Sequence, residues 1–235
     1  MKVFAISDLH LSAAAEDKSM DVFGHEWEGY MQRIIQNWTR TVSDDDLVLI
    51  PGDISWATYL NEAGPDFRYI ERLPGRKLLV KGNHDYWWST KRKLDQFIEK
   101  EGLKTISFIQ NNAFFCRDLA VVGSRAWKTP EEYGFTIEDE KIYNRELIRL
   151  ELSLKHTKGF EGTIIAMLHY PPFGANGKPS AFVDLLSAYR VSICIYGHLH
   201  GKSCENSVTG DYNGIAYYLV SADYLNFTPI CLGEW

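Results

Sequence analysis

The chain has 235 residues, of which 45% are hydrophobic and 24% are charged, and its net charge is −6 at pH 7. A chain of this length can bury a large core, and its ordinary globular composition excludes a disordered or fibrous protein. The negative charge argues against a general nucleic-acid binder, which needs grouped Lys and Arg, and the nearest basic run, 91–93, is predicted as a solvated helix face.

The four cysteines are scattered and form no CxxC pair, which favours a reduced compartment over a disulfide framework. No basic region followed by an apolar segment precedes the first strand-like run, so we expect no secretory signal. No apolar stretch approaches the roughly 20 residues that span a bilayer, so we expect no membrane partner. A cytoplasmic protein is predicted, and the sequence gives no indication of its oligomeric state.

The first half of the chain alternates short apolar runs with segments of helical periodicity. Strands are predicted at 2–7, 47–50 and 77–80, and a loop at 11–24. Helices are predicted at 27–41, from Ser55 to the breaker pair Gly64 and Pro65, at 67–72, and from a cap at Ser89 or Thr90 to Gly102.

The second half begins with three short runs at 105–109, 113–116 and 119–123, which predict an antiparallel meander continued by the runs at 215–220 and 229–232. Helices are predicted at 137–156 and 181–189, strands at 163–168 and 192–196, and a Gly- and Pro-rich loop at 173–180. There is no low-complexity linker and no repeat, so one domain over 1–235 is expected. The order of elements predicts an α/β sandwich of two sheets flanked by helices.

Residues of the kinds that bind metals follow five of the strand-like runs. They are Asp8 with His10, Asp53, Asn83 with His84, His169, and His198 with His200. Each alone has a structural explanation, such as a turn, a cap or a buried core histidine. Together they hold five of the seven histidines, and the carboxyl ends of strands in α/β sheets form binding sites. We therefore expect all of them on one rim.

The number of candidate ligands indicates how many ions the site would hold. Without His84, two Asp, one Asn and four His remain, which are too many for one four-coordinate ion and suit two ions that share a carboxylate. Asp53, the only ligand in its motif, is the natural bridge. Imidazole and carboxylate ligands favour Mn, Fe, Zn, Co or Ni over Ca or Mg.

The series D-x-H, G-D, G-N-H-D, H and G-H-L-H, from Asp8 to His200, resembles that of the calcineurin-like metallophosphoesterases. The resemblance implies a four-layer αββα fold with two mixed β-sheets, and it implies His84 as a catalytic residue. The implied ligands of one ion are Asp8, His10, Asp53 and His200, and those of the other are Asp53, Asn83, His169 and His198.

One position departs from the family pattern. The phosphoprotein-phosphatase branch keeps a second Asp three residues after the bridging one, where it orients the catalytic His, and this chain has Trp56 there. His84 would then be oriented by Asp85 or by a backbone carbonyl, or it would have no orienting group. A phosphoprotein phosphatase is therefore disfavoured. Gly82 is expected to permit the tight turn that presents Asn83 and His84.

The expected chemistry follows from charge. Two divalent ions against two carboxylates leave the site positive, so it should attract a phosphate ester. Two ions about 3.5 to 4 Å apart would clamp phosphoryl oxygens and turn a bridging water into hydroxide for in-line attack. His84 would stabilise the phosphoryl group or protonate the leaving oxygen. Asn83 is also a candidate to contact substrate, and Arg125 would either pair with a substrate phosphate or form a surface salt bridge.

The sequence thus predicts a metal-dependent phosphoesterase acting on a small phosphorylated molecule. A nuclease or cyclic-nucleotide phosphodiesterase on the same site is the first alternative, and a non-catalytic metal-binding scaffold is the second. Several aromatic residues near the motifs are candidates for either a pocket wall or the core. These residues are Trp56, Tyr86, Trp87, Trp88 and Trp127.

Overall fold

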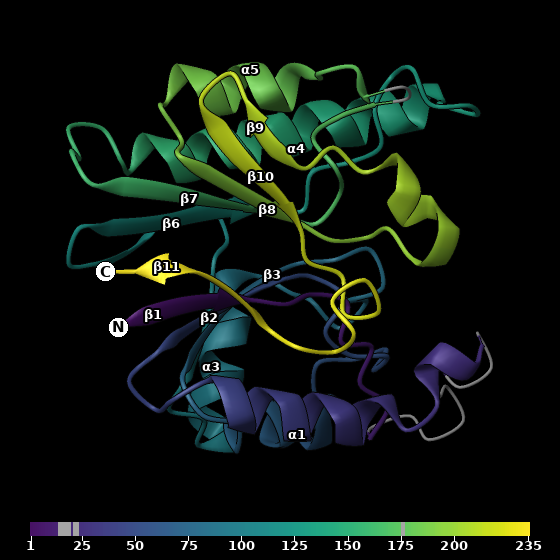
Figure 1. Ribbon diagram of the computed structural model, residues 1–235, viewed down its shortest axis with the longest axis vertical. Helices are drawn as coiled ribbons and strands as arrows, with labels where there is room; N and C mark the ends of the chain where they lie inside the picture. Colours follow the sequence, from purple (N-terminus) through teal and green to yellow (C-terminus); the bar gives the residue numbers. More distant parts are fainter. Residues whose placement is uncertain (14–19, 21–23, 175–176) are drawn as a thin grey trace.

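Two β-sheets pack face to face between two layers of helices in the computed structural model of the chain (Figure 1). The structure describes residues 1–13, 20, 24–174 and 177–235. The loops predicted at 11–24 and 173–180 therefore lie partly outside the described residues. Within the described residues, no helix combines the length and apolar character needed to cross a bilayer.

The first sheet has the strand order β11-β1-β2-β3-β4, and its strands β1 to β4 run parallel. Its strands are β1 (Lys2–Ala5), β2 (Leu47–Pro51), β3 (Arg76–Val80), β4 (Ile106–Phe108) and the antiparallel β11 (Ile230–Glu234). Its outer face is covered by α1 (Tyr30–Thr41), α2 (Gly64–Glu71) and α3 (Lys91–Glu101). The side chains of Ile34 and Trp38 on α1 and Phe67 on α2 are completely buried there.

The second sheet has the order β5-β6-β7-β8-β10-β9, with four parallel strands between two antiparallel edge strands. Its strands are β5 (Phe114–Cys116), β6 (Leu119–Ser124), β7 (Thr163–Leu168), β8 (Ile193–Tyr196), β9 (Gly210–Tyr212) and β10 (Ile215–Leu219). It is covered by α4 (Ile137–Lys155) and α5 (Ala181–Ala188). Two short 3-10 helices, η3 (His25–Trp27) and η5 (Gly201–Asn206), lie outside these layers.

A core between the two sheets joins them. Val3, Leu49 and Leu78 of the first sheet pack with Val121 and Ile165 of the second, and all five are buried completely. Strands covered on both faces are expected to be apolar along their whole length, which explains the continuous apolar runs of the sequence. The predicted four-layer αββα sandwich with two mixed sheets is confirmed.

The predicted antiparallel meander is wrong. Its first strand, β4, extends the first sheet parallel to β3, whereas β5 and β6 form a hairpin in the second sheet. The last two strands of the predicted meander also belong to different sheets. β10 lies parallel to β8 in the second sheet, and β11 pairs with β1 in the first. A short apolar run has the same sequence pattern in a parallel and an antiparallel pair, so the direction of pairing was not encoded locally.

The predicted helix from Ser55 to Gly64 and Pro65 is also wrong. The residues before Gly64 form bridges and turns, and α2 begins at Gly64 with Pro65 in its first turn. Proline fits there because the first N–H groups of a helix have no partner within the helix. The cap expected at Ser89 or Thr90 is Thr90, whose hydroxyl accepts a hydrogen bond from the Lys93 N–H.

Candidate metal centre

The segments that follow β1, β2, β3, β7 and β8 converge at one edge of the two sheets. The Asp8 N–H donates to the Gly52 carbonyl at 3.0 Å, and the His10 N–H donates to the Asp53 carbonyl at 3.0 Å. The two sheets also meet here, because the Ser7 N–H donates to the Val220 carbonyl at 2.7 Å. Backbone hydrogen bonds therefore fix the positions from which the predicted ligands project.

Four of the predicted ligands have left-handed backbone conformations. Asp8, His10, Asp53 and His198 have φ angles of 57°, 44°, 52° and 73°. Positive φ is uncommon outside glycine, costs energy, and gathers at functional sites where the surrounding structure enforces it. The chain thus turns sharply at four of the predicted ligands.

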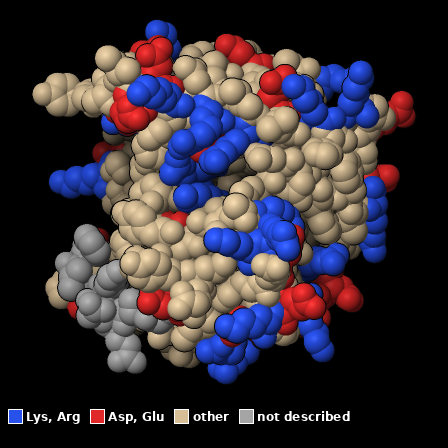
Figure 2. Space-filling model, turned by 180° about the vertical axis from the view of Figure 1, so that it is seen from behind, with Lys and Arg blue, Asp and Glu red and all other residues tan. Residues whose placement is uncertain are grey.

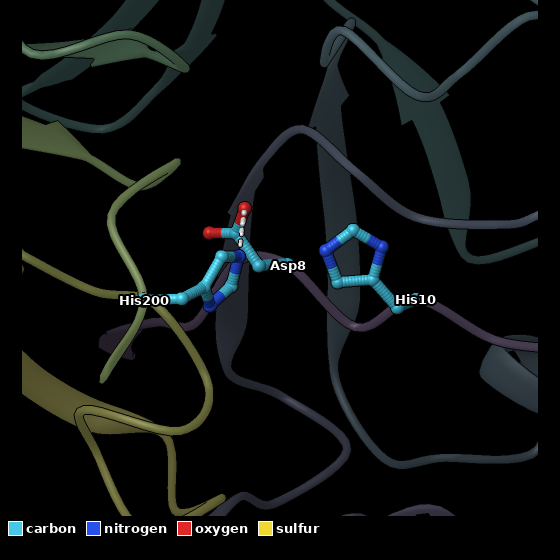
Figure 3. A group of neighbouring side chains, drawn as sticks. All are labelled: Asp8, His10 and His200. Carbon is cyan, nitrogen blue, oxygen red and sulfur yellow. Dashed lines mark ion pairs between the residues drawn. The ribbon is translucent and has the colours of Figure 1, made fainter. Parts of the chain in front are cut away.

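One group of possible ligands consists of Asp8, His10 and His200, whose ligand atoms all lie within 4.8 Å of one another. Figure 3 shows the three side chains, two from the segment after β1 and one from the segment after β8, with Asp8 Oδ1 3.5 Å from His200 Nε2. His200 Nε2 is buried and faces the Asp8 carboxylate. It therefore presents a ligand atom to the space between these side chains.

A second group consists of Asp8, Asp53 and His169, again within 4.8 Å. Asp53 Oδ2 lies 3.4 Å from His169 Nε2 and 3.8 Å from His10 Nε2, so it stands between the two groups. Asp8 is common to both groups, a sharing that was not expected from the sequence. Asp53 belongs to the second group alone, and its bridging role stays a prediction.

Asn83 connects the remaining histidines to this cluster. Its Oδ1 lies 2.6 Å from His169 Nε2 and 2.9 Å from His198 Nδ1. His169 Nδ1 donates to the Pro51 carbonyl at 3.0 Å, which leaves Nε2 with a lone pair facing the amide oxygen. Two lone pairs in contact need a proton or a cation. The seven predicted ligands thus lie close together, and five of them form the two groups that could hold a metal ion.

The donor set also fits a metal ion in size and chemistry. Oxygen and nitrogen ligands lie about 2.0–2.2 Å from ions such as Zn²⁺, so ligand atoms around one ion are about 3–4 Å apart. The spacings within both groups are close to that range. A buried cluster of Asp and His compatible with a metal site is therefore present at the predicted rim.

The electrostatics of the cluster favour the neutral form of three of its histidines and the charged form of Asp8. Burial lowers the pKa of His10 and of His169 to about 3 and that of His198 to about 4. Burial opposes ionisation of Asp8, but the hydrogen bond with His200 and the nearby imidazoles lower its pKa well below the ordinary value. Neutral imidazoles and ionised carboxylates are the forms that bind metals.

Asp53 is in a different environment. Burial and the neighbouring carboxylates of Asp8 and Asp85 raise its pKa well above the ordinary value. Three buried carboxylates repel one another, and a cation between them would relieve that repulsion. The carboxylates of Asp8 and Asp85 disfavour the ionised form of Asp53 when no cation is bound. The same negative charges would strengthen the binding of a metal ion.

Asp223, which follows β10, was missed in the sequence. His200 Nδ1 lies 2.9 Å from Asp223 Oδ1, and the Gly201 N–H donates to Asp223 Oδ2 at 2.9 Å. Burial opposes protonation of His200, but the hydrogen bonds with Asp223 and Asp8 raise its pKa to about 10. A carboxylate behind a ligating histidine orients the ring and increases its basicity. The sequence signal that could have identified Asp223 is the one used for the other candidates, namely an Asp shortly after an apolar strand.

Asp85 does not hydrogen-bond to His84, which was one expectation from the sequence. Its fully buried carboxylate accepts hydrogen bonds from the backbone N–H groups of Asp53 at 3.0 Å, Ile54 at 2.9 Å and Gly82 at 2.7 Å. Asp85 therefore ties the segment after β2 to the segment after β3. It fixes the backbone that carries Asp53 and Asn83.

The ring of His84 is held by packing. It lies 4.7 Å from the Trp56 ring and 5.6 Å from the His10 ring, centroid to centroid. No described residue hydrogen-bonds to its buried Nδ1 atom. Burial lowers the pKa of His84, and its backbone N–H donates to Asp53 Oδ1 at 2.8 Å. Trp56, at the position of the missing Asp, thus supports the ring by contact.

Gly82 serves close packing, whereas a turn was expected. A Cβ atom on Gly82 would lie 2.0 Å from Asp53 Oδ1 and 2.2 Å from the Asp53 nitrogen, and its φ is not in the left-handed region. No side chain fits between the two loops. The glycine allows Asp53 to approach the backbone of the Asn83 segment.

A cavity of about 410 Å³ opens beside the cluster. It is lined by His10, Met20, Glu26, Trp27, Asp53, Trp56, His84, His198, His200 and Gly201. Of the five aromatic candidates, only Trp56 lines this cavity among the described residues, together with the unpredicted Trp27. Trp87 is core at 2% exposure, and Tyr86 is exposed. Trp88 packs on Phe108, and Trp127 packs on Tyr170.

Arg125 does not line the cavity beside the ligands. Its guanidinium lies 3.4 Å from Glu146 Oε1 and 4.4 Å from the centre of the Trp127 ring. The side chain is only 11% exposed, so the ion pair lies beneath the surface. Arg125 instead lines a separate cleft.

Comparison with known proteins agrees with this geometry. Residues 1–202 match the family model described as calcineurin-like phosphoesterase. An uncharacterized protein of Methanocaldococcus jannaschii is 31% identical over 84 residues, which are 36% of this chain and 47% of that protein. The matched segment thus spans about half the length of this relative.

Solved structures show the same fold at low sequence identity. A Thermus thermophilus protein is 12% identical with a TM-score of 0.57, over 98% of this chain and 97% of that one. An Aquifex aeolicus protein of unknown function is 17% identical with a TM-score of 0.52, over 98% of this chain and 95% of that one. The family match covers most of the chain, including every motif from Asp8 to His200, and the chain belongs to the calcineurin-like phosphoesterase family.

Proposed function

We propose that the protein hydrolyses a phosphate ester on a small molecule with the help of two metal ions. The observation that carries the proposal is the pair of overlapping ligand groups that share Asp8, with Asp53 between them and His84 at the wall of the adjoining cavity. Two bound divalent ions would polarise the phosphoryl oxygens and supply hydroxide as the nucleophile. Mn, Fe, Zn, Co and Ni suit these ligands.

The chain's own residues position the reacting groups. His10, His169 and His198 are neutral because of their burial, so each offers a lone pair. Asn83 would contribute its amide oxygen as a ligand, and its amide nitrogen would donate to a phosphoryl oxygen. His84 lines the cavity and is free to contact the leaving oxygen. We assign it the role of stabilising the developing charge or donating a proton.

The size of the cavity supports a small substrate. About 410 Å³ lies in the range of pockets for small organic molecules, and Trp27 and Trp56 give it an apolar wall. The residues of the site follow strands of both sheets, and an apolar core joins the two sheets, which supports one domain over 1–235. The four free cysteines support the expected cytoplasmic location.

The test is hydrolysis of p-nitrophenyl phosphate, a monoester, and bis(p-nitrophenyl) phosphate, a diester, with added Mn²⁺. We expect Asp53→Asn to abolish activity and His84→Ala to lower kcat by about 10²–10⁴. Asp95→Asn, which removes an exposed partner of Lys91, is the control and should match the parent. Equal activity in all four proteins, or none in any, would contradict the proposal.

The same experiment separates the alternatives. A diester rate above the monoester rate would indicate a phosphodiesterase or nuclease acting on the same site. Activity in none of the proteins, together with tight metal binding, would indicate the non-catalytic scaffold. The presence of His84 at the cavity favours an enzyme over the scaffold.

A further inference from the structure

A second cleft, of about 350 Å³, opens between the two sheets on the side of β3 and β6. It is lined by the ends of these strands, by the segment after β4, by the segment before α3, and by α4. Figure 2 shows Lys and Arg side chains gathered around a hollow on the face of the molecule opposite to that of Figure 1. None of the residues that line this cleft lines the cavity beside the metal ligands.

The lining is strongly positive for a protein whose net charge is −6. Lys81, Arg125 and Arg149 line the cleft, and Glu146 is the only acidic residue among the described lining residues. Arg145 adds a further charge, because its Nε lies 4.0 Å from Glu146 Oε1. These residues are scattered along the sequence, so the basic cluster forms only on folding.

The single carboxylate is already shared. Glu146 Oε1 lies 2.7 Å from Arg149 Nη1 and 3.4 Å from Arg125 Nη2, and its side chain is only 1% exposed. Arg125 Nε is buried and has no hydrogen-bond partner among the described residues. A buried N–H donor without an acceptor costs free energy, and an anion in the cleft would supply the acceptor.

The cleft is connected to the metal centre through the backbone. Lys81 immediately precedes the segment that carries Asn83 and His84. The Arg125 carbonyl accepts hydrogen bonds from the N–H groups of His169 at 3.2 Å and of Tyr170 at 3.0 Å. Two walls of the cleft therefore continue directly into ligand-bearing segments. Lys81, Arg125 and Arg149 line the same cleft, so a bound anion would face all three positive charges.

We propose that this cleft is a second anion site, which binds a phosphoryl group of the substrate other than the one that is hydrolysed. The guanidinium groups would pair with its oxygens, Lys81 would add a point charge, and the lining Ser89 and Thr90 hydroxyls would donate hydrogen bonds. The substrate class is then a small molecule that carries two separate phosphoryl groups. This inference rests on the proposed phosphoesterase function.

Binding to a metal-loaded but inactive protein tests the site without depending on turnover. In the His84→Ala background with Mn²⁺, calorimetry would compare adenosine 3′,5′-bisphosphate with adenosine 3′- and 5′-monophosphate. We expect the bisphosphate to bind at least about tenfold more tightly than either monophosphate. Lys81→Met and, separately, Arg149→Gln should remove most of this advantage. Lys141→Met, which removes an exposed charge from α4 outside the cleft, should leave it intact.

Arg149 is partly exposed, so Arg149→Gln keeps the test valid if Lys81→Met fails to fold. Equal affinity for bisphosphate and monophosphates, or equal effects of Lys141→Met and Arg149→Gln, would overturn the second anion site. Tighter binding of a short single-stranded oligonucleotide, lost in Arg149→Gln, would overturn the small-molecule class. Failure of the proposed function is separate, because it is seen as absent hydrolysis of both p-nitrophenyl esters by the parent.

Discussion

Replacing Asp85 by Asn tests whether this carboxylate holds the two ligand-bearing loops together. Asp85 Oδ2 accepts the N–H groups of Gly82 and Asp53, and Oδ1 accepts that of Ile54. The substitution turns one oxygen into an NH₂ group and keeps the volume of the side chain. If the amide oxygen takes the Oδ2 position, the hydrogen bonds from the Gly82 and Asp53 N–H groups are kept. The new NH₂ group then takes the Oδ1 position, where it faces the Ile54 N–H, which is also a donor.

The expected cost comes from buried groups that lose their partners. Each unpaired buried donor costs about 1–3 kcal/mol, so the Ile54 N–H and the new amide together should lower the free energy of unfolding by about 2–6 kcal/mol. Because the loop that carries Asp53 would shift, we also expect metal affinity to fall by about 10–100-fold. Urea unfolding at pH 7 and a Mn²⁺ titration measure the two quantities.

The matched control is Asp95→Asn, which removes an exposed carboxylate and should change stability by no more than about 0.5 kcal/mol. If Asp85→Asn were as stable as this control and bound Mn²⁺ as tightly, the positioning role would be refuted. A loss of kcat with unchanged stability and metal affinity would instead support direct participation in catalysis.

Three further substitutions test other parts of the structure. Asp223→Asn should weaken Mn²⁺ binding by about 10–100-fold with little change in stability, because Asp223 orients His200, and a titration measures this. Gly82→Ala should destabilise by at least about 1–3 kcal/mol in urea unfolding, because its Cβ would lie 2.0 Å from Asp53 Oδ1. Burial lowers the pKa of the fully buried Lys77 to about 8. The unfolded chain therefore binds more protons between pH 8 and about 10, and stability should rise with pH in that window. Lys77→Met should abolish this rise and increase the free energy of unfolding by about 1–3 kcal/mol at pH 7. The melting temperatures of the parent and the variant, measured as a function of pH, test this, and identical profiles would contradict it.

The rim of ligands was predictable because it depends on strand ends alone. Each of Asp8, Asp53, Asn83 and His169 follows a largely apolar run, and parallel strands bring their carboxyl ends to the same edge. The helices were predictable where periodicity and caps agreed, as at Thr90. Local sequence was sufficient for both features.

Other features depend on contacts between distant segments. The pairing of β4 with β3, in place of a meander, is decided by the packing of whole sheets. The carboxylate of Asp85 is adjacent in sequence to His84, yet two of its partners, the N–H groups of Asp53 and Ile54, belong to the distant segment after β2. The basic cleft joins Lys81, Arg125 and Arg149 from three separate elements, so no run of the sequence could indicate it.

The metal content of the purified protein tests the central claim most directly. After incubation with Mn²⁺ and removal of free ions, elemental analysis should find two ions per chain in the parent and in His84→Ala. Asp53→Asn should lose at least one of them, because Asp53 Oδ2 stands between the two ligand groups. A parent protein that retains no ion, or an Asp53→Asn variant that retains two, would contradict the account of this site.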